Sequence, residues 1–204
     1  MMKRMNNGQR STQKAVFLDK DGTLIYDVPY NVDPDLIRFR PGTMEGLALL
    51  HAAGYRLVVI TNQSGVARGY FAEEELAAVR AHLRQSFAAA GVPLSGFYYC
   101  PHHPEGAVRP YAKACACRKP EPGMFLRAAA ELAIALDRSW YVGDILDDVE
   151  AGRRAGCRTV LVETGGETEW NLTPQRLPHH IAGNLAEAAR IITALTIPEA
   201  ICVP

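Results

Sequence analysis

The sequence lacks an excess of charge of either sign, a long apolar segment and a secretory leader. Its 22 Lys and Arg residues balance 22 Asp and Glu residues, so the formal net charge is zero at pH 7. A neutral chain has no global positive field of the kind that holds a nucleic-acid backbone. No apolar stretch approaches the roughly 18 residues of a membrane span, and residues 1–14 are polar and basic without a following apolar region. We therefore expect a cytoplasmic protein with no nucleic-acid or membrane partner.

The chain also lacks internal repeats and low-complexity tracts. Its 204 residues suffice for one domain with a sizeable core. We expect a disordered leader over residues 1–14, a single domain over residues 15–196 and a C-terminal tail over residues 197–204. The five cysteines are expected to be thiols or metal ligands rather than disulfides, because the expected compartment is reducing.

Short apolar runs alternate with segments of helical periodicity along the whole domain. Such alternation predicts an α/β fold, in which a parallel sheet is covered by helices on both faces. The expected strands cover residues 15–19, 55–62, 96–100, 139–144 and 158–164, and a short one is expected within residues 179–195. The expected helices cover residues 41–54, 71–91, 122–134 and 147–156, and a final helix is expected in the later part of residues 179–195. The long irregular segment between residues 100 and 123 is expected to be functional, because loops of this length without secondary structure are uncommon.

Polar side chains follow the expected strands at the points where these end. Asp19 and Asp21 follow the first strand, Thr61 lies at the end of the second, and Asp144 closes the fourth. Lys119 lies in the segment "CRKP" between them. The carboxyl ends of parallel strands share one edge of the sheet, where ligands of such sheets bind. Carboxylates suit Mg²⁺, and a hydroxyl and an ammonium suit phosphoryl oxygens, so the pattern predicts Mg²⁺-dependent phosphoryl transfer.

The spacing of the two aspartates fits this chemistry. In an extended segment Asp19 and Asp21 lie on the same side, so one can act as nucleophile and the other as general acid and base. Gly22 lets the backbone turn sharply and approach a phosphate. Taken alone, an Asp-x-Asp pair at a strand end is more often part of a turn.

Several neighbouring residues have two interpretations. Thr61 or Asn62 alone is typical of a helix cap. Asp147 and Asp148 are explained equally well as acids at a helix N-terminus and as site residues. The combination of these residues at successive strand ends favours a common site.

The irregular segment contains a second candidate site. Cys100, His102, Cys115 and Cys117 follow the pattern C-x-H, twelve residues, C-x-C. Three sulfurs and one imidazole form a tetrahedral set that suits structural Zn²⁺, and the ion would order a loop with little apolar content. His103 competes with His102 for the nitrogen position. The remaining cysteines are expected to be packed thiols.

The motifs "FLDKDGTL", "ITNQSG", "CRKP" and "YVGDILDD" resemble those of the haloacid dehalogenase (HAD) superfamily of Mg²⁺-dependent phosphatases. The resemblance implies a three-layer Rossmann-like fold, with Asp19 as nucleophile and Asp21 as general acid and base. It implies Asp19, the backbone carbonyl of Asp21, and Asp144 as Mg²⁺ ligands, and Thr61 and Lys119 as groups that stabilise the phosphoryl group. The expected substrate-binding residues are Gly22, Asn62, Gln63, Ser64 and Arg118.

The zinc loop over residues 100–117, together with "QSGVARG", is similar to the D-glycero-D-manno-heptose 1,7-bisphosphate 7-phosphatase family. This resemblance implies hydrolysis of the C7 phosphate by a monomer without a large cap domain, as part of bacterial surface-glycan synthesis. It implies that Arg118 contacts the distal part of the sugar substrate and that residues 27–39 form a neighbouring loop. Ile145 departs from the family pattern, in which some members carry Lys.

Other functions are compatible with these motifs, among them hydrolysis of another sugar bisphosphate. Histidinol-phosphate phosphatases share the zinc loop and the C-x-C-R-K-P motif, but their loop is shorter and they lack "SGVARG". A catalytically silent metal-binding protein would be expected to lack one of the four site residues Asp19, Asp21, Lys119 and Asp144, and all are present. A nucleic-acid 3′-phosphatase would need a basic groove and stacking aromatics. The neutral net charge, and the pair Tyr98-Tyr99 as the candidate stacking aromatics, argue weakly against this function.

Overall fold

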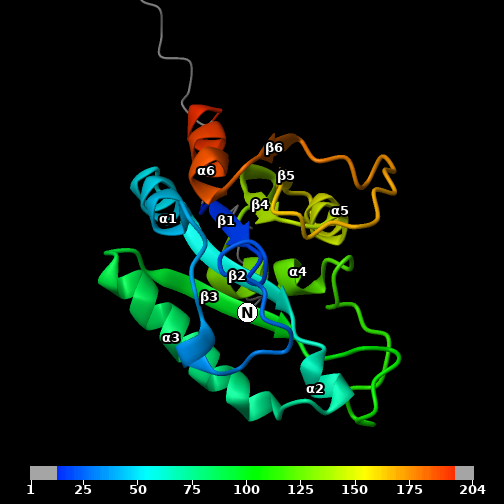
Figure 1. Ribbon diagram of the computed structural model, residues 1–204. Helices are drawn as coiled ribbons and strands as arrows, with labels where there is room; N and C mark the ends of the chain where they lie inside the picture. The colour runs from blue at the N-terminus through cyan, green and yellow to red at the C-terminus, as the bar shows by residue number, and fades with distance from the viewer. Residues whose placement is uncertain (1–12, 196–204) are drawn as a thin grey trace, which may run out of the picture.

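The computed structural model describes residues 13–195 and contains a six-stranded parallel sheet (Figure 1). The strand order is β3-β2-β1-β4-β5-β6, so the first strand lies inside the sheet between β2 and β4. Residues Val16 to Leu18 pair in register with β2 on one side and with β4 on the other. The strands are β1 (Ala15–Leu18), β2 (Arg56–Asn62), β3 (Leu94–Cys100), β4 (Trp140–Gly143), β5 (Arg158–Val162) and β6 (His180–Ala182).

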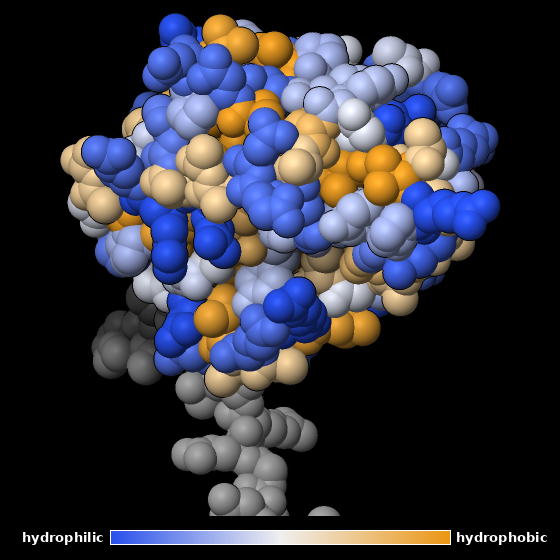
Figure 2. Space-filling model, turned by 90° about the horizontal axis from the view of Figure 1, so that it is seen from below, coloured by the Kyte–Doolittle hydropathy of each residue, from blue (hydrophilic) through white to orange (hydrophobic). Residues whose placement is uncertain are grey.

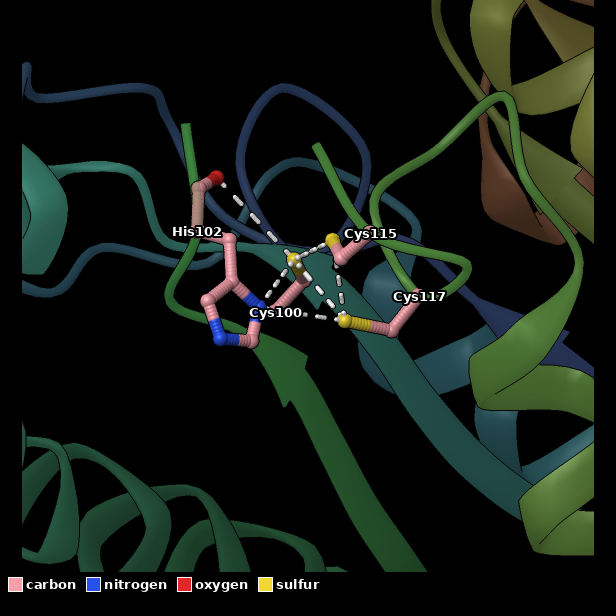
Figure 3. Close-up of side chains that lie close together, drawn as sticks. All are labelled: Cys100, His102, Cys115 and Cys117. Carbon is pink, nitrogen blue, oxygen red and sulfur yellow. Dashed lines mark hydrogen bonds between the residues drawn. The ribbon is translucent and has the colours of Figure 1, made fainter. Parts of the chain in front are cut away.

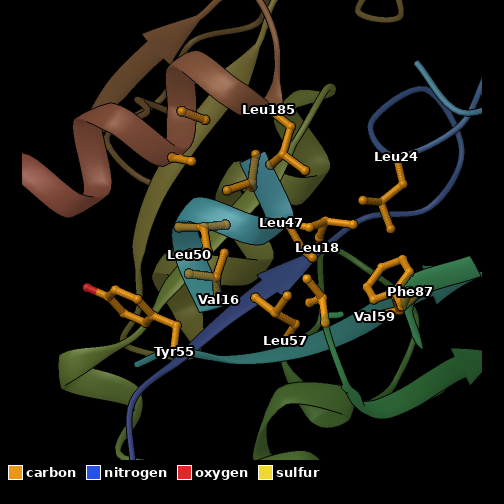
Figure 4. Close-up of a cluster of buried hydrophobic side chains, with 14 of the residues drawn as sticks. Val16, Leu18, Leu24, Leu47, Leu50, Tyr55, Leu57, Val59, Phe87 and Leu185 are labelled. Carbon is orange, nitrogen blue, oxygen red and sulfur yellow. The ribbon is translucent and has the colours of Figure 1, made fainter. Parts of the chain in front are cut away.

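Helices cover both faces of the sheet and form the three layers that the sequence predicts. Val16 and Leu18 of β1 are fully buried in one cluster with α1, α3 and α6 (Figure 4), whereas Ala15 and Phe17 are buried on the opposite face with α4 and α5. A strand buried on both faces is the reason for the continuous apolar run "AVFL". The helices are α1 (Thr43–Ala52), α2 (Gly65–Arg68), α3 (Leu76–Ala89), α4 (Gly123–Leu132), α5 (Leu146–Arg154) and α6 (Leu185–Ala194), with 3₁₀ turns at Pro34–Leu36, Glu73–Glu75 and Leu136–Arg138.

The main difference from the predicted elements concerns the long helix expected over residues 71–91. The α-helix begins only at Leu76, because Phe71 is buried against Val66 and the preceding turn is 3₁₀. The side chain of Glu75 closes this turn by accepting the backbone N–H of Ala72 at 2.7 Å. The short helix α2 and the 3₁₀ turns were not predicted, since segments of three or four residues show no periodicity.

The expected leader and tail lie largely outside the described residues. Of the expected leader, only Gln13 and Lys14 are described: Gln13 bridges to Ile134, and the carbonyl of Lys14 accepts the N–H of Arg56 at 3.0 Å. Among residues 13–195, no helix is long and apolar enough to cross a bilayer. On the face shown in Figure 2, hydrophobic residues lie in small groups between hydrophilic ones.

Candidate active site

A cavity of about 430 Å³ lies at the carboxyl ends of β1, β2 and β4. The strand-end residues expected to converge therefore do so, and the sheet supplies the framework that fixes them. The backbone N–H of Asp19 bonds to the carbonyl of Val142, which ties the end of β1 to β4. The cavity is lined by Asp19, Asp21, Gly22, Tyr26, Asp27, Arg40, Thr61, Asn62, Lys119, Asp144, Ile145, Thr164, Gly165 and Gly166.

The chain turns away from the sheet at Gly22, as its position after two aspartates predicts. Gly22 has a φ of 81°, and a Cβ at this position would lie 2.1 Å from Oδ2 of Asp144. Only glycine therefore combines this backbone conformation with this close approach. The turn brings the end of β1 against the end of β4 and leaves Asp19 and Asp21 facing the cavity.

Lys119 is the buried cation of the site. Its ammonium donates to a carboxylate oxygen of Asp19, to Oδ1 of Asp148 at 2.7 Å and to the hydroxyl of Tyr141 at 2.9 Å. Burial favours the neutral amine, but the carboxylates of Asp148 and Asp19 outweigh it and raise the pKa of Lys119 above its ordinary value. Lys119 therefore stays charged and is held in one orientation by all three of its donors.

The buried carboxylates carry more negative charge than Lys119 can balance. Burial raises the pKa of Asp19 well above its ordinary value, although Lys119 opposes the shift. Burial, together with the charge of Asp148, raises the pKa of Asp144 to about 6. Three buried carboxylates around a single ammonium need another positive charge.

The geometry of these carboxylates fits a hard cation. One oxygen from each of Asp19, Asp144 and Asp148 lies within 4.8 Å of the others. The two oxygens of Asp148 already accept four hydrogen bonds, from Lys119, Tyr141 and the backbone N–H groups of Asp144 and Ile145. Asp148 therefore positions its neighbours, while Asp19 and Asp144 retain free lone pairs for a cation.

Asp144 is oriented by two hydroxyl groups from different strand ends. Thr23 donates to Oδ1 at 2.9 Å and Thr164 donates to Oδ2 at 3.2 Å. Asp21 is held separately, by Lys20 at 2.9 Å and by the side-chain amide of Gln63 at 3.1 Å. The side chain of Asp21 thus stands apart from the carboxylate cluster, as a proton-transfer group should.

The predicted substrate-binding residues do not all line this cavity. Gly22 and Asn62 do, whereas Gln63 and Ser64 line an adjacent cavity of about 290 Å³ that is bounded by residues 27–31. Gln63 links the two, because its amide donates to Thr61 Oγ1 and to Asp21. Arg118 is not among the residues that line either cavity, and its guanidinium lies 3.5 Å from the carbonyl oxygen of His102.

Several residues in or beside the cavity were missed by sequence reasoning. Thr164 and the two glycines after it follow β5, so the same strand-end argument would have found them. Tyr26 and Arg40 lie in the loop between β1 and α1, where no periodic pattern distinguishes them. Tyr141 lies within β4, where sequence predicts a core residue. Its hydroxyl accepts a hydrogen bond from Lys119 and donates one to Asp148.

The side chains of the second candidate site, Cys100, His102, Cys115 and Cys117, lie close together (Figure 3). The three sulfurs lie 3.2–3.5 Å apart, and Nδ1 of His102 lies 3.4 Å from the sulfur of Cys117. Burial and the nearby Lys113 lower the pKa of His102, which favours the neutral imidazole that binds metals. These three sulfurs and one nitrogen fit tetrahedral Zn²⁺.

The structure separates the two neighbouring histidines. Nδ1 of His103 accepts the backbone N–H of Glu105 at 3.1 Å, and its Nε2 lies 3.1 Å from the guanidinium of Arg68. Both ring nitrogens of His103 thus have partners outside the sulfur cluster, and His102 is the histidine in it.

Comparison with known proteins identifies the family. A HAD-hydrolase-like family model matches residues 116–188. The D-glycero-β-D-manno-heptose-1,7-bisphosphate 7-phosphatase of Pasteurella multocida is 49% identical over 75% of this chain and 83% of its own. The protein of the same name from Photorhabdus laumondii is 42% identical over 89% of this chain and 96% of its own. The chain belongs to this family of HAD phosphatases.

A solved structure supports the same assignment. The D,D-heptose 1,7-bisphosphate phosphatase of B. bronchiseptica, which was crystallised with magnesium and phosphate, is 31% identical. It superposes with a TM-score of 0.75 over 90% of this chain and 99% of its own. The expected HAD-like fold and phosphatase class are thereby confirmed.

Proposed function

We propose that this protein hydrolyses the C7 phosphate of D-glycero-β-D-manno-heptose 1,7-bisphosphate through an aspartyl-phosphate intermediate. The observation that carries the proposal is the contact between Asp19 and Lys119 at the floor of a cavity that also contains Asp21 and Asp144. The substrate and its β anomer are inferred from the names of relatives that are 42–49% identical.

The chemistry begins at Asp19. A carboxylate oxygen of Asp19 attacks the phosphorus of the C7 phosphate, and the bond from phosphorus to O7 breaks. Asp21 gives its proton to O7 as the sugar leaves, and then accepts a proton from the water that attacks the aspartyl-phosphate. Both transfers suit a carboxyl group that is exposed to the cavity and oriented by Gln63.

The surrounding residues stabilise the phosphoryl group during transfer. Lys119 supplies a fixed positive charge, and Thr61 supplies a hydroxyl on the same cavity wall. Mg²⁺, when held by Asp19, Asp144 and the backbone carbonyl of Asp21, would neutralise charge on the phosphoryl oxygens. Asp148 and Tyr141 keep Lys119 in place without contacting the cavity themselves.

The test is a substrate panel assayed with Mg²⁺. It contains both anomers of heptose 1,7-bisphosphate, fructose 1,6-bisphosphate, histidinol phosphate and a 3′-phosphorylated oligonucleotide. We expect the highest kcat/KM with the β anomer. A preference for histidinol phosphate would overturn the substrate and leave the mechanism intact. Asp19→Asn is expected to remain folded and lose turnover; retained turnover would refute the nucleophile.

The remaining parts of the proposal concern the second metal and the setting. We infer a structural Zn²⁺ at the Cys₃His cluster, a cytoplasmic location, a monomeric state and no nucleic-acid or membrane partner. Neutral charge supports the last of these. Size-exclusion chromatography with light scattering tests the monomer, and a mass of twice 22.3 kDa would contradict it.

A further inference from the structure

The charge balance of the catalytic cavity singles out one arginine. Four carboxylates line this cavity, and Lys119 and Arg40 are the cationic residues among the described residues that line it. The ammonium of Lys119 is already engaged by Asp19, Asp148 and Tyr141. Arg40 is therefore the cation of this cavity that is left for a ligand.

The backbone of Arg40 is firmly anchored. Its N–H donates to the carbonyl of Leu24 at 3.0 Å, and its own carbonyl accepts the N–H of Thr43 at the start of α1. The neighbouring bridge between Ile25 and Phe39 continues this pairing. The loop that leaves β1 and the segment that enters α1 thus hold Arg40 in the lining of the cavity.

The side chain of Arg40 is oriented but not neutralised. Its guanidinium lies over the ring of Tyr26, with 4.9 Å between Cζ and the ring centroid. Within residues 13–195, no carboxylate forms an ion pair with it and no acceptor forms a hydrogen bond with its guanidinium. A cation–π contact holds a guanidinium over a ring without using its N–H groups, which stay available for bidentate contact with a phosphate.

We propose that Arg40 binds the second phosphate of a bisphosphate substrate while the first reacts at Asp19, and thereby sets the preference for bisphosphates over monophosphates. This inference rests on the proposed phosphatase function. Ile145, the apolar neighbour of Asp144 in the same cavity, offers no charge for this purpose. Arg118 interacts instead with the backbone of the zinc loop, so Arg40 provides a phosphate site that the family resemblance does not assign.

The experiment compares bisphosphates with monophosphates in the Arg40→Gln variant. The substrate pairs are heptose 1,7-bisphosphate with heptose 7-phosphate, and fructose 1,6-bisphosphate with fructose 6-phosphate; p-nitrophenyl phosphate reports the chemical step alone. Loss of one charged contact is expected to lower kcat/KM for the bisphosphates by about 10- to 100-fold, mainly through KM. Activity on the monophosphates and on p-nitrophenyl phosphate should change less than about twofold.

Two further variants make the result specific. Arg84→Gln removes an equal charge from the exposed surface of α3 and should leave every substrate unchanged. Arg40→Lys should recover only part of the bisphosphate activity, since an ammonium cannot make the bidentate contact.

The possible failures can be told apart. An equal loss on all substrates in Arg40→Gln would show a structural role and overturn the inference, as would no loss at all. If Arg118→Gln abolishes the bisphosphate preference while Arg40→Gln does not, Arg118 alone binds the second phosphate. If the wild-type enzyme does not hydrolyse heptose 1,7-bisphosphate, the proposed function is refuted. The comparison of fructose 1,6-bisphosphate with fructose 6-phosphate still tests the role of Arg40. Absence of any bisphosphate preference in the wild type overturns the inference.

Discussion

Asn62 and Lys119 are joined by two reciprocal hydrogen bonds across 57 residues of sequence. The side-chain amide of Asn62 donates to the carbonyl of Lys119 at 3.3 Å, and the N–H of Lys119 donates to Oδ1 of Asn62 at 3.1 Å. The end of β2 thus holds the backbone from which the Lys119 ammonium reaches Asp19. Asn62 was expected to bind substrate, but this pair gives it a second role in positioning.

Removal of this pair should slow the reaction. In Asn62→Ala the backbone of Lys119 loses both bonds, so its ammonium is held less firmly at Asp19. Small misplacements of catalytic groups are costly, and we expect kcat to fall by about 10- to 100-fold. Steady-state kinetics with p-nitrophenyl phosphate measure this value without a contribution from recognition of the sugar.

A second asparagine provides the control for lost stability. Asn184 caps α6 by accepting the N–H of Glu187 at 3.0 Å and does not line the cavity. Asn184→Ala should cost about 1 kcal/mol in the free energy of unfolding and leave kcat unchanged. Equal activity in both variants would refute the positioning role of Asn62.

Replacement of Gly22 should be far more damaging than a positive φ alone explains. In Gly22→Ala the new Cβ would meet a carboxylate oxygen of Asp144 at 2.1 Å and force the turn after β1 to open. This displacement separates Asp144 from Asp19 and disrupts the cation site. We expect kcat/KM to fall at least about 100-fold, because the groups move apart by an ångström or more.

Gly156 provides a control that separates the clash at Gly22 from the cost of a positive φ. Its φ is 88°, and no atom lies within 4 Å of a Cβ placed there. Gly156→Ala should therefore lower the free energy of unfolding by about 1–2 kcal/mol, because alanine disfavours the left-handed conformation, and it should cause no clash. Urea denaturation and kinetics should show a larger stability loss in Gly22→Ala and normal activity in Gly156→Ala; similar behaviour of the two variants would contradict the clash.

The parallel sheet and the convergence of its strand ends could be predicted from sequence. Alternating elements require a parallel sheet, and a parallel sheet brings Asp19, Thr61 and Asp144 to one edge wherever the loops run. The grouping of Cys100, His102, Cys115 and Cys117 was predictable for a similar reason, since residue type and spacing limit the choice. The strand-end prediction depends on backbone topology alone. The Cys₃His prediction depends on metal-binding chemistry that few residue types provide.

Other features depend on how loops fold, which local patterns do not encode. Asp148 was left between a helix-terminal and a site role, and its four hydrogen bonds show that it has both. Arg40 was missed because its cavity position follows from the pairing of two loop segments on either side of residues 27–37. Arg118 was expected to face substrate, but its contact with His102 depends on the path of the zinc loop.

The two adjacent histidines of the zinc loop offer a matched test of the proposed Zn²⁺ site. His102 lies in the sulfur cluster, whereas both ring nitrogens of His103 have partners elsewhere. Metal analysis should find about one zinc per chain in the wild type. After dialysis against a chelator, His102→Ala should have lost its zinc and His103→Ala should retain it.

Loss of zinc should also reduce activity. Cys117 immediately precedes Arg118 and Lys119, so an unfolded loop would release the catalytic lysine from Asn62. We therefore expect His102→Ala to lose most of its kcat while the sheet stays folded by circular dichroism. A zinc-free variant with full activity would show that the loop does not position Lys119, and zinc loss in both variants would contradict the assignment of His102.

The raised pKa of Asp144 leads to a prediction about stability and pH. Burial and the charge of Asp148 raise its pKa from 3.8 to about 6 in the folded protein. Above pH 6 the carboxylate is ionised in both the folded and the unfolded states, and the folded state bears the cost of burying the charge. Below about pH 4 the group is protonated in both states, and this cost disappears. The buried, ionised Asp144 thus lowers the free energy of unfolding of the wild type at neutral pH, where Mg²⁺ is expected to bind.

Asp144→Asn should remove the free-energy penalty of burying this charge and should also abolish the activity. Without metal, we expect the variant to be more stable than the wild type by about 1–3 kcal/mol at pH 8, with the difference vanishing near pH 4. Added Mg²⁺ should stabilise the wild type and not the variant, because the variant lacks a ligand carboxylate. Urea denaturation across this pH range measures both effects. Asp35→Asn, in the exposed 3₁₀ turn at Pro34–Leu36, is the control and should show neither effect. An Asp144→Asn variant that is less stable than the wild type at pH 8 would contradict the prediction.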